Sequence, residues 1–281
     1  MTDAIPASGP LRSEIFAANR AVGRLALAVG GGPGGTRRTR VHEAGSLRAR
    51  FPNSSGQALD AVIVNVAGGM TGGDRFDIGI EAGSGARLCV TTAAAEKIYR
   101  SLGPDTKIAV KLGVGQGAAL AWLPQETILF DRARLRRRID VDLAPGASLV
   151  MAETTIFGRS AMGETVVTGH FSDHWRVRSE GALVFAESVE LGGGIAQQLA
   201  ARAIAGGGAA VASVLKIPGD EDNVAAVRAM QQAFAGEVGV SAWNGLALAR
   251  CVAADGAALR HDLTKLLIAL GTGPLPRLWM N

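Results

Sequence analysis

The stretch DIGIEAGSGARLCVTT, residues 77 to 92, decides the fold class, because its pattern returns three more times along the chain. It joins a run of alternating apolar and polar residues to a second apolar run through a short turn that ends in Gly-Ala. The other copies are VKLGVGQGAALAWLP (110–124), IDVDLAPGASLVMAETT (139–155) and WRVRSEGALVFAES (175–188). Such alternation is typical of strands with one buried face, so each copy predicts two strands around a glycine turn.

The spacing of the copies predicts one extended β body from about residue 15 to 215. The Gly-Ala pairs fall at 85/86, 117/118, 146/147 and 181/182, so the intervals are 32, 29 and 35 residues. A lone hairpin is only marginally stable in water, and several units therefore have to stack or pair to bury their apolar faces. The intervals are too irregular to require a strict solenoid.

The last third of the chain has a different pattern. Residues 221–236 place Val224, Val227, Met230 and Phe234 at helical spacing, and residues 256–270 carry a stripe of leucines. Strand-like EVGVSAW and LALARCVAA lie between these two segments. We therefore expect a mainly β protein of one domain, residues 1–281, in which two helices and their strands form a C-terminal α+β cap over about 216–281.

Composition limits the class of protein. The 281 residues are 48% apolar and 19% charged, which is globular rather than disordered. Neither a secretory signal nor an apolar run long enough to span a membrane is visible, and we expect a cytoplasmic location. Cys89 and Cys251 have no CxxC spacing and are expected to be buried free thiols, with a disulfide or a metal pair as the alternative.

Arginines cluster at positions 37, 38 and 40 and again at 132, 134, 136, 137 and 138, within a net charge of +4. Because no aromatic residues lie between them to stack on bases, we do not expect nucleic acid as a partner. A solvated strand face or a docking patch for an acidic partner explains the clusters.

Three familiar sites are excluded or weak. VNVAGGMTGGD (64–74) lacks the lysine and the following helix of a phosphate loop, and ends instead in Asp74 before an alternating strand. His170 and His174 have a spacing that suits metal ligands on a helix, yet their surroundings predict a strand. No GxSxG elbow of a hydrolase is present.

Two glutamates share strand faces with apolar residues. Glu153 follows LVMA and Glu187 follows the similar LVFA, so each is expected on an otherwise apolar face. A carboxylate there is costly unless it is paired, hydrated or bound to a cation. An arginine partner and a wet internal passage both satisfy this requirement, and Glu126 and Asp131 are weaker candidates for the same passage. The alternative is a carbohydrate-active enzyme with paired carboxylates, although the few aromatic residues are not grouped into platforms.

The run GGMTGGDRFDIGIEAGSGARLCVTTAAAEKIYR, residues 68–100, resembles the signature of the urease accessory protein family called UreD or UreH. Its shared elements are a Gly-Gly-x-x-Gly-Gly-Asp turn, Gly-x-Gly-Ala, a Thr-Thr pair and Lys-x-Tyr-Arg. The segment from Trp122 to Glu164, LRARFP near the start and PRLWMN at the end are also similar to the family. The resemblance covers most of the chain; VAGGM departs from it, where many members carry prolines before the glycines.

The resemblance implies a scaffold without catalytic residues, with a mainly β fold and two helices. Family members bind urease apoprotein and recruit a helical accessory protein (UreF-like) and through it a GTPase (UreG-like), often as a dimer of heterodimers. They are thought to carry nickel through an internal tunnel, so transient Ni²⁺ is expected and no tightly bound cofactor. Asp74, Glu153 and Glu187 are then candidate nickel ligands, and Arg277 and Trp279 are candidate partner contacts. Carboxylates suit transient carriage because they hold nickel weakly enough to release it.

Overall fold

The computed structural model describes residues 20–53, 58–272 and 274–280. These residues form seventeen strands, three α-helices and three short 3₁₀ turns. The strands build a β-solenoid of about four turns, which confirms the mainly β fold.

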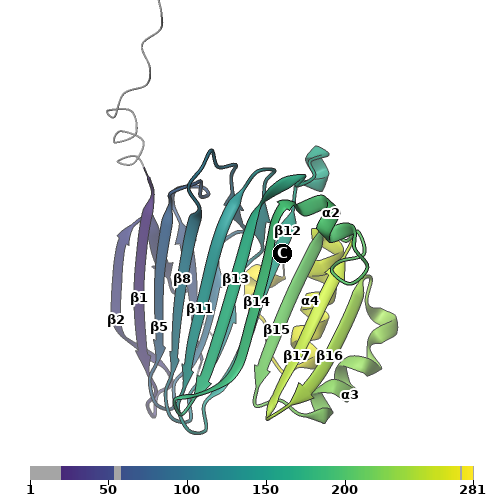
Figure 1. The fold of residues 1–281 in the computed structure, drawn as a ribbon. Helices are drawn as coiled ribbons and strands as arrows, with labels where there is room; N and C mark the ends of the chain where they lie inside the picture. The colour runs from purple at the N-terminus through teal and green to yellow at the C-terminus, as the bar shows by residue number, and fades with distance from the viewer. Residues whose placement is uncertain (1–19, 54–57, 273, 281) are drawn as a thin grey trace, which may run out of the picture.

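Two sheets face each other across the first core, and helices cover the outer side of one of them (Figure 1). Sheet A contains, in spatial order, β14 (Ala182–Gly194), β13 (Thr168–Ser179), β11 (Arg134–Leu143), β8 (Thr106–Val114), β5 (Arg75–Ala82), β1 (Val22–Gly30) and β2 (Arg37–Gly45). Sheet B contains β16 (Glu237–Trp243), β17 (Leu246–Ala253), β15 (Ala210–Ile217), β12 (Ser148–Phe157), β9 (Ala119–Leu123), β6 (Arg87–Thr92), β4 (Leu59–Asn65) and β3 (Leu47–Arg50). The short strands β10 (Thr127–Leu129) and β7 (Glu96–Ile98) pair with each other, and β10 also pairs with β12.

The first three sequence repeats are turns of the solenoid rather than hairpins. In the first copy, β5 lies in sheet A and β6 in sheet B, and each pairs in parallel with the corresponding strand of the next copy. The predicted strand–turn–strand units are thus confirmed, and they pair with the next copy rather than within themselves; alternation shows which face of a strand is buried but not which strand is its neighbour. The fourth copy is a hairpin, since β13 and β14 pair antiparallel around Glu180 and Gly181.

The Gly-Ala pairs have a structural reason. Gly85, Gly117 and Gly146 have φ values of 65°, 62° and 68°, the left-handed region that glycine enters without steric cost. The alanines that follow the first two, Ala86 and Ala118, point into the core. Successive turns also stack through their backbones, as when the N–H of Gly85 donates to the carbonyl of Gln116 over 2.9 Å.

The C-terminal strands continue sheet B instead of forming a separate cap. The predicted boundary at residue 216 falls inside β15, which pairs with β12 on one side and β17 on the other. Helices α3 (Glu221–Ala229) and α4 (Gly256–Ala269) confirm the two predicted helices, and Asp220 and Asp255 cap their N-termini. A short helix, α2 (Ile195–Ala200), was not predicted.

The molecule has two apolar layers. Inward side chains of both sheets fill the first, and α4 packs leucines such as Leu259 and Leu263 on the outer face of sheet B in the second. Cys89 and Cys251 are both free, as expected. Across the described ranges, no helix has the length and apolar character needed to cross a membrane.

Candidate functional site: a buried ion cluster between two cavities

An inward-facing column of side chains changes from apolar to ionic along the solenoid. The parallel register of sheet A places Phe76, Ile108, Arg137 and Asp173 side by side on consecutive strands. The first two belong to the apolar core, whereas Arg137 and Asp173 are charged and equally buried. The repeat thus holds a guanidinium and a carboxylate at positions that are apolar in the earlier turns.

Arg137 connects the two sheets through charge-assisted hydrogen bonds. Its Nε and Nη2 donate to both carboxylate oxygens of Asp173, over 3.0 and 2.6 Å. Its Nη1 donates to Glu153 on the facing strand β12 and, over 3.3 Å, to Thr127. The other oxygen of Glu153 accepts the indole N–H of Trp122 over 2.8 Å. Glu153 therefore has the arginine partner that one interpretation of the sequence required.

Burial and charge act against each other in this cluster. Arg137 is 4% and Glu153 6% exposed. Burial alone lowers the pKa of Arg137, but Asp173 and Glu153 outweigh it, so the pKa is raised and the guanidinium stays charged. For Glu153 burial prevails: its pKa is raised although Arg137 and the Trp122 hydrogen bond lower it. Burial in this site therefore disfavours the charged form of Glu153.

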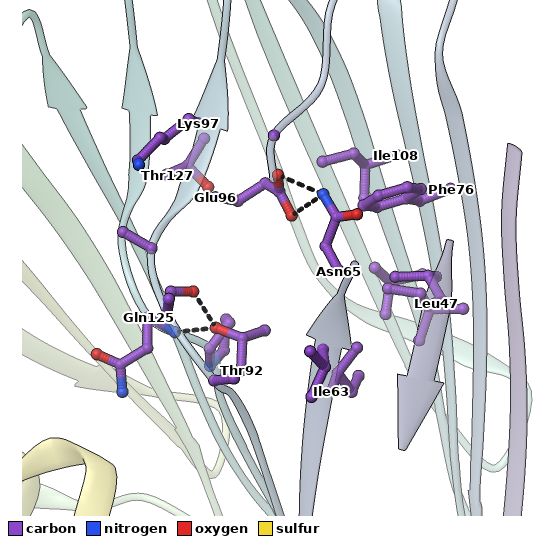
Figure 2. A pocket seen from close by; sticks show the side chains of 18 of the residues that line it. Leu47, Ile63, Asn65, Phe76, Thr92, Glu96, Lys97, Ile108, Gln125 and Thr127 are labelled. Atoms are coloured by element: carbon purple, nitrogen blue, oxygen red, sulfur yellow. Dashed lines mark hydrogen bonds between the residues drawn. The ribbon is translucent and has the colours of Figure 1, made fainter. Parts of the chain in front are cut away.

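A cavity of about 250 Å³ lies on the N-terminal side of the cluster (Figure 2). Phe76, Ile108, Arg137 and Glu153 line its inner part. Near the loops, Asn65 donates to both oxygens of Glu96 over 2.9 and 3.2 Å, and Figure 2 shows these two side chains pointing toward one another. Burial raises the pKa of Glu96 to about 7, despite the opposing hydrogen bond from Asn65.

A second cavity, of about 550 Å³, lies on the other side of the cluster. Arg137 and Glu153 line it as well, so the ion pair separates the two cavities. Glu187 on β14 contributes a side chain that is 9% exposed, and Ser213 on β15 donates to its Oε1 over 3.5 Å. Its Oε2 lies 3.3 Å from Arg250, whose side chain is 61% exposed, and accepts no hydrogen bond from the described residues.

The other predicted carboxylates are engaged elsewhere. Asp74 accepts the backbone N–H groups of Ala21 and Thr71, over 2.9 and 2.7 Å, and so caps its own glycine turn. Asp131 accepts the N–H groups of the loop at Val167 and Thr168. Glu126 pairs with Arg260 of α4 over 2.9 Å. None of these three lines either cavity, so the structure brings together only Glu153 and Glu187 of the predicted set.

The C-terminal pair is divided between core and surface. Trp279 is buried against its own chain, where its N–H donates to Leu123 over 3.0 Å and Arg260 lies over its ring. Arg277 is exposed and remains available to a partner. The role of either residue in partner binding stays a prediction.

Sequence reasoning missed the partners of the glutamates. None of Arg137, Asp173 and Glu96 was predicted as a site residue. Strand parity nevertheless places Arg137 on the same buried face as Leu135 and Ile139, and Asp173 on the same buried face as Phe171 and Trp175. His170 and His174 share the opposite, outer face of β13. Within the part of the chain that the structure describes, no group of three or more histidine, cysteine or acidic residues is placed to hold a metal ion. The two cavities therefore contain separate carboxylates and not a clustered set of ligands.

Comparison with known proteins adds independent information. Residues 21–280 match the family described as "UreD urease accessory protein". The chain is 55% identical to "Urease accessory protein UreD" of Rhodopseudomonas palustris (strain BisA53), over 96% of this chain and 94% of the relative. It is 53% identical to the protein of the same name from Bradyrhizobium diazoefficiens, over 96% and 97% of the two chains.

Proposed function

Because the chain belongs to the UreD family of urease accessory proteins, we propose that it is a non-catalytic scaffold that helps to deliver nickel to urease apoprotein in the cytoplasm. A helical, UreF-like accessory protein and a UreG-like GTPase are its proposed partners, as a dimer of heterodimers. The relatives' names support the role in urease maturation. Two cavities inside the protein support the proposed route by which a cation is carried.

The observation that carries the nickel proposal is the pair of cavities that meet at Arg137 and Glu153. From one end of the proposed passage to the other, Glu96 lies in the first cavity, Glu153 between the two cavities, and Glu187 in the second cavity. A divalent cation moves between such sites if each holds it only weakly, as scattered carboxylates do. Nickel is the cargo in this scheme and not a resident cofactor.

The closed ion pair sets a condition on passage. Glu153 is shared by Arg137 and Trp122, so a cation reaches it only if Arg137 turns away from one of its carboxylates. A divalent cation offers Glu153 more charge than the guanidinium does, which favours the exchange once the cation has arrived. In the proposed scheme Arg137 therefore closes the empty passage.

A carbohydrate-active enzyme would need two free carboxyls in an open cleft. Glu153 is instead paired and 6% exposed. The site therefore gives that alternative no support.

The test of scaffold function is genetic. Deletion of the gene should leave urease expressed but without metal, because delivery and not synthesis is lost. Active, nickel-loaded urease in the deletion strain would refute the proposal.

The test of the passage is a pair of variants that each remove one carboxylate. Glu187→Gln removes a charge from the second cavity, whereas Glu237→Gln changes an exposed side chain on β16 that lines neither cavity. We expect Glu187→Gln to lower the nickel content and activity of urease while complex assembly is unchanged, and Glu237→Gln to do neither. Equal activation by both variants would mean that the nickel path does not pass Glu187.

A further inference from the structure

The outer face of sheet A contains a hollow lined by cations. Helices α3 and α4 pack on sheet B, so the outer side of β5, β8, β11 and β13 faces away from them (Figure 1). A hollow of about 300 Å³ lies on this side, where Ala109 of β8 contributes only a methyl group. Ligand sites occupy roughly 300–1,000 Å³, so the hollow is large enough for a small ligand. The outward side chains around it are Arg75, Lys107, Arg136, Arg138, Ser172 and His174.

The register of sheet A brings three of these cations to one level. Arg75, Lys107 and Arg136 lie opposite one another on the neighbouring strands β5, β8 and β11. Like charges directly opposite each other on adjacent strands are destabilising. An anion bound between the three side chains would relieve this repulsion.

Carboxylates beside the hollow neutralise its arginines but not its lysine. The ion pairs have N···O distances of 2.9, 2.5 and 2.6 Å and are, in that order, Arg75–Asp77, Arg136–Asp105 and Arg138–Asp140. Arg134 shares Asp105 with Arg136. Lys107 is exposed and forms no ion pair with a carboxylate of the described residues. The hollow therefore keeps a positive charge, and none of the described residues that line it is acidic.

Several hydrogen-bond donors of the hollow are not used by these carboxylates. In the described part of the chain Arg136 donates only through Nε, so both of its terminal NH₂ groups are free. Arg75 and Arg138 donate through Nε and Nη2 and each keep Nη1. Together with the Lys107 ammonium, these donors come from three strands. A phosphate group has at least three acceptor oxygens pointing in different directions, so it can accept from all three strands at once.

A histidine held between two serines adds a further donor. Nε2 of His174 lies 2.8 Å from Oγ of Ser172, and Nδ1 lies 2.9 Å from Oγ of Ser188. In the tautomer that carries the proton on Nε2, the ring donates to Ser172 and accepts from Ser188. The Ser172 hydroxyl, on a residue that is 4% exposed, is then free to donate to an anion in the hollow.

We propose that this hollow is a binding site for the phosphate group of a small molecule, either inorganic phosphate or a compound that carries two linked phosphates. Lys107 is the central cation of the site, and Arg136 and Ser172 supply neighbouring donors. The site lies on the opposite side of sheet A from the two cavities of the proposed nickel passage. The inference therefore goes beyond the proposed function and does not depend on it.

The test is isothermal titration calorimetry of the full-length chain with inorganic phosphate and with pyrophosphate, at an ionic strength held constant with sodium chloride. We expect saturable binding. Equal affinity for the two probes would assign a single phosphate, and tighter binding of pyrophosphate would assign a diphosphate. Lys107→Gln should weaken binding about tenfold or more, because it removes a charged hydrogen-bond donor that no described carboxylate neutralises.

Lys111→Gln is the matched control, because Lys111 is the next outward lysine on β8, is exposed, and lies outside the hollow. It removes the same charge from the same face and should bind both probes as the wild type does. The inference is overturned if neither probe binds saturably. It is overturned equally if Lys111→Gln weakens binding as much as Lys107→Gln, since the attraction would then belong to the whole face. Binding of a polyglutamate peptide but of neither phosphate probe would also overturn it.

Discussion

Replacement of Arg137 by methionine would remove the one positive charge from a site that holds two buried carboxylates. Methionine is similar in length and fills much of the space, so the change is mainly one of charge. Asp173 loses two hydrogen bonds, and Glu153 and Thr127 lose one each. Glu153 keeps only the indole N–H of Trp122.

The expected loss of stability is large. Breaking a buried ion pair by removing one partner costs roughly 3–5 kcal/mol, because the remaining charge is left without compensation. For a chain of this size the midpoint of thermal unfolding should fall on the order of 10 °C. The loss should be smaller at acidic pH, since burial already raises the pKa of Glu153 and a proton can neutralise it once Arg137 is gone.

The assay is urea unfolding of the purified chain, followed by tryptophan fluorescence at pH 5.5 and 8. Arg138→Met is the matched control, because Arg138 is the next residue on β11 and has a 59% exposed side chain paired with Asp140 on the outer face. Exposed pairs contribute about 0–1 kcal/mol. If Arg137→Met costs no more than Arg138→Met at pH 8, the reasoning from the buried charges is refuted.

Three further changes test other parts of the structure. Gly117→Ala should lower the free energy of unfolding by about 1 kcal/mol through backbone strain alone, because Gly117 has a φ of 62° and a Cβ there would meet no atom within 4 Å. Gly239 is equally free of contacts but has no positive φ, so Gly239→Ala should be neutral in the same denaturation assay. Glu96→Gln should flatten the pH dependence of stability between pH 5 and 8. The folded-state pKa of Glu96 is raised from 4.5 to about 7, so its carboxyl favours the folded state below pH 4.5 and loses this contribution as the pH rises through 7; an unchanged slope would contradict that assignment. Trp279→Ala should cost about 3–5 kcal/mol, whereas Arg277→Ala on the surface should be neutral; a stable Trp279→Ala chain would contradict the buried role of this side chain.

The sequence contained more information on the fold than on the site. Gly-Ala spacing located the turns, because the left-handed glycine and the buried alanine are local requirements. Alternation could not reveal whether β5 pairs with β6 or with β8, since strand pairing depends on contacts between distant residues. The hydrogen bonds of Asp74 also involve Ala21, a residue 53 positions away, and were not readable from the turn itself.

The arginine run shows what stricter use of strand parity would have added. Arg136, Arg137 and Arg138 resemble one solvated cluster when they are counted together. Taken as a strand, only Arg137 has the parity of the inward residues Leu135 and Ile139, so one guanidinium of the three had to be buried. A buried arginine requires a carboxylate, and Glu153 was the candidate already noted for its apolar surroundings. Its second partner, Asp173, follows only from the register between β11 and β13.

The charged column has no evident purpose in holding the fold together. Ile108 and Phe76 occupy the same column one and two turns earlier, respectively, and are satisfied by apolar packing. Replacing a buried ionic cluster by apolar residues of similar volume is often neutral or stabilising, so Arg137, Glu153 and Asp173 are a costly way to fill this space. A role that needs the charges themselves accounts for them better. The proposed transient carriage of a cation is such a role, because it would require a carboxylate inside the protein and a positive group that pairs with this carboxylate when no cation is bound.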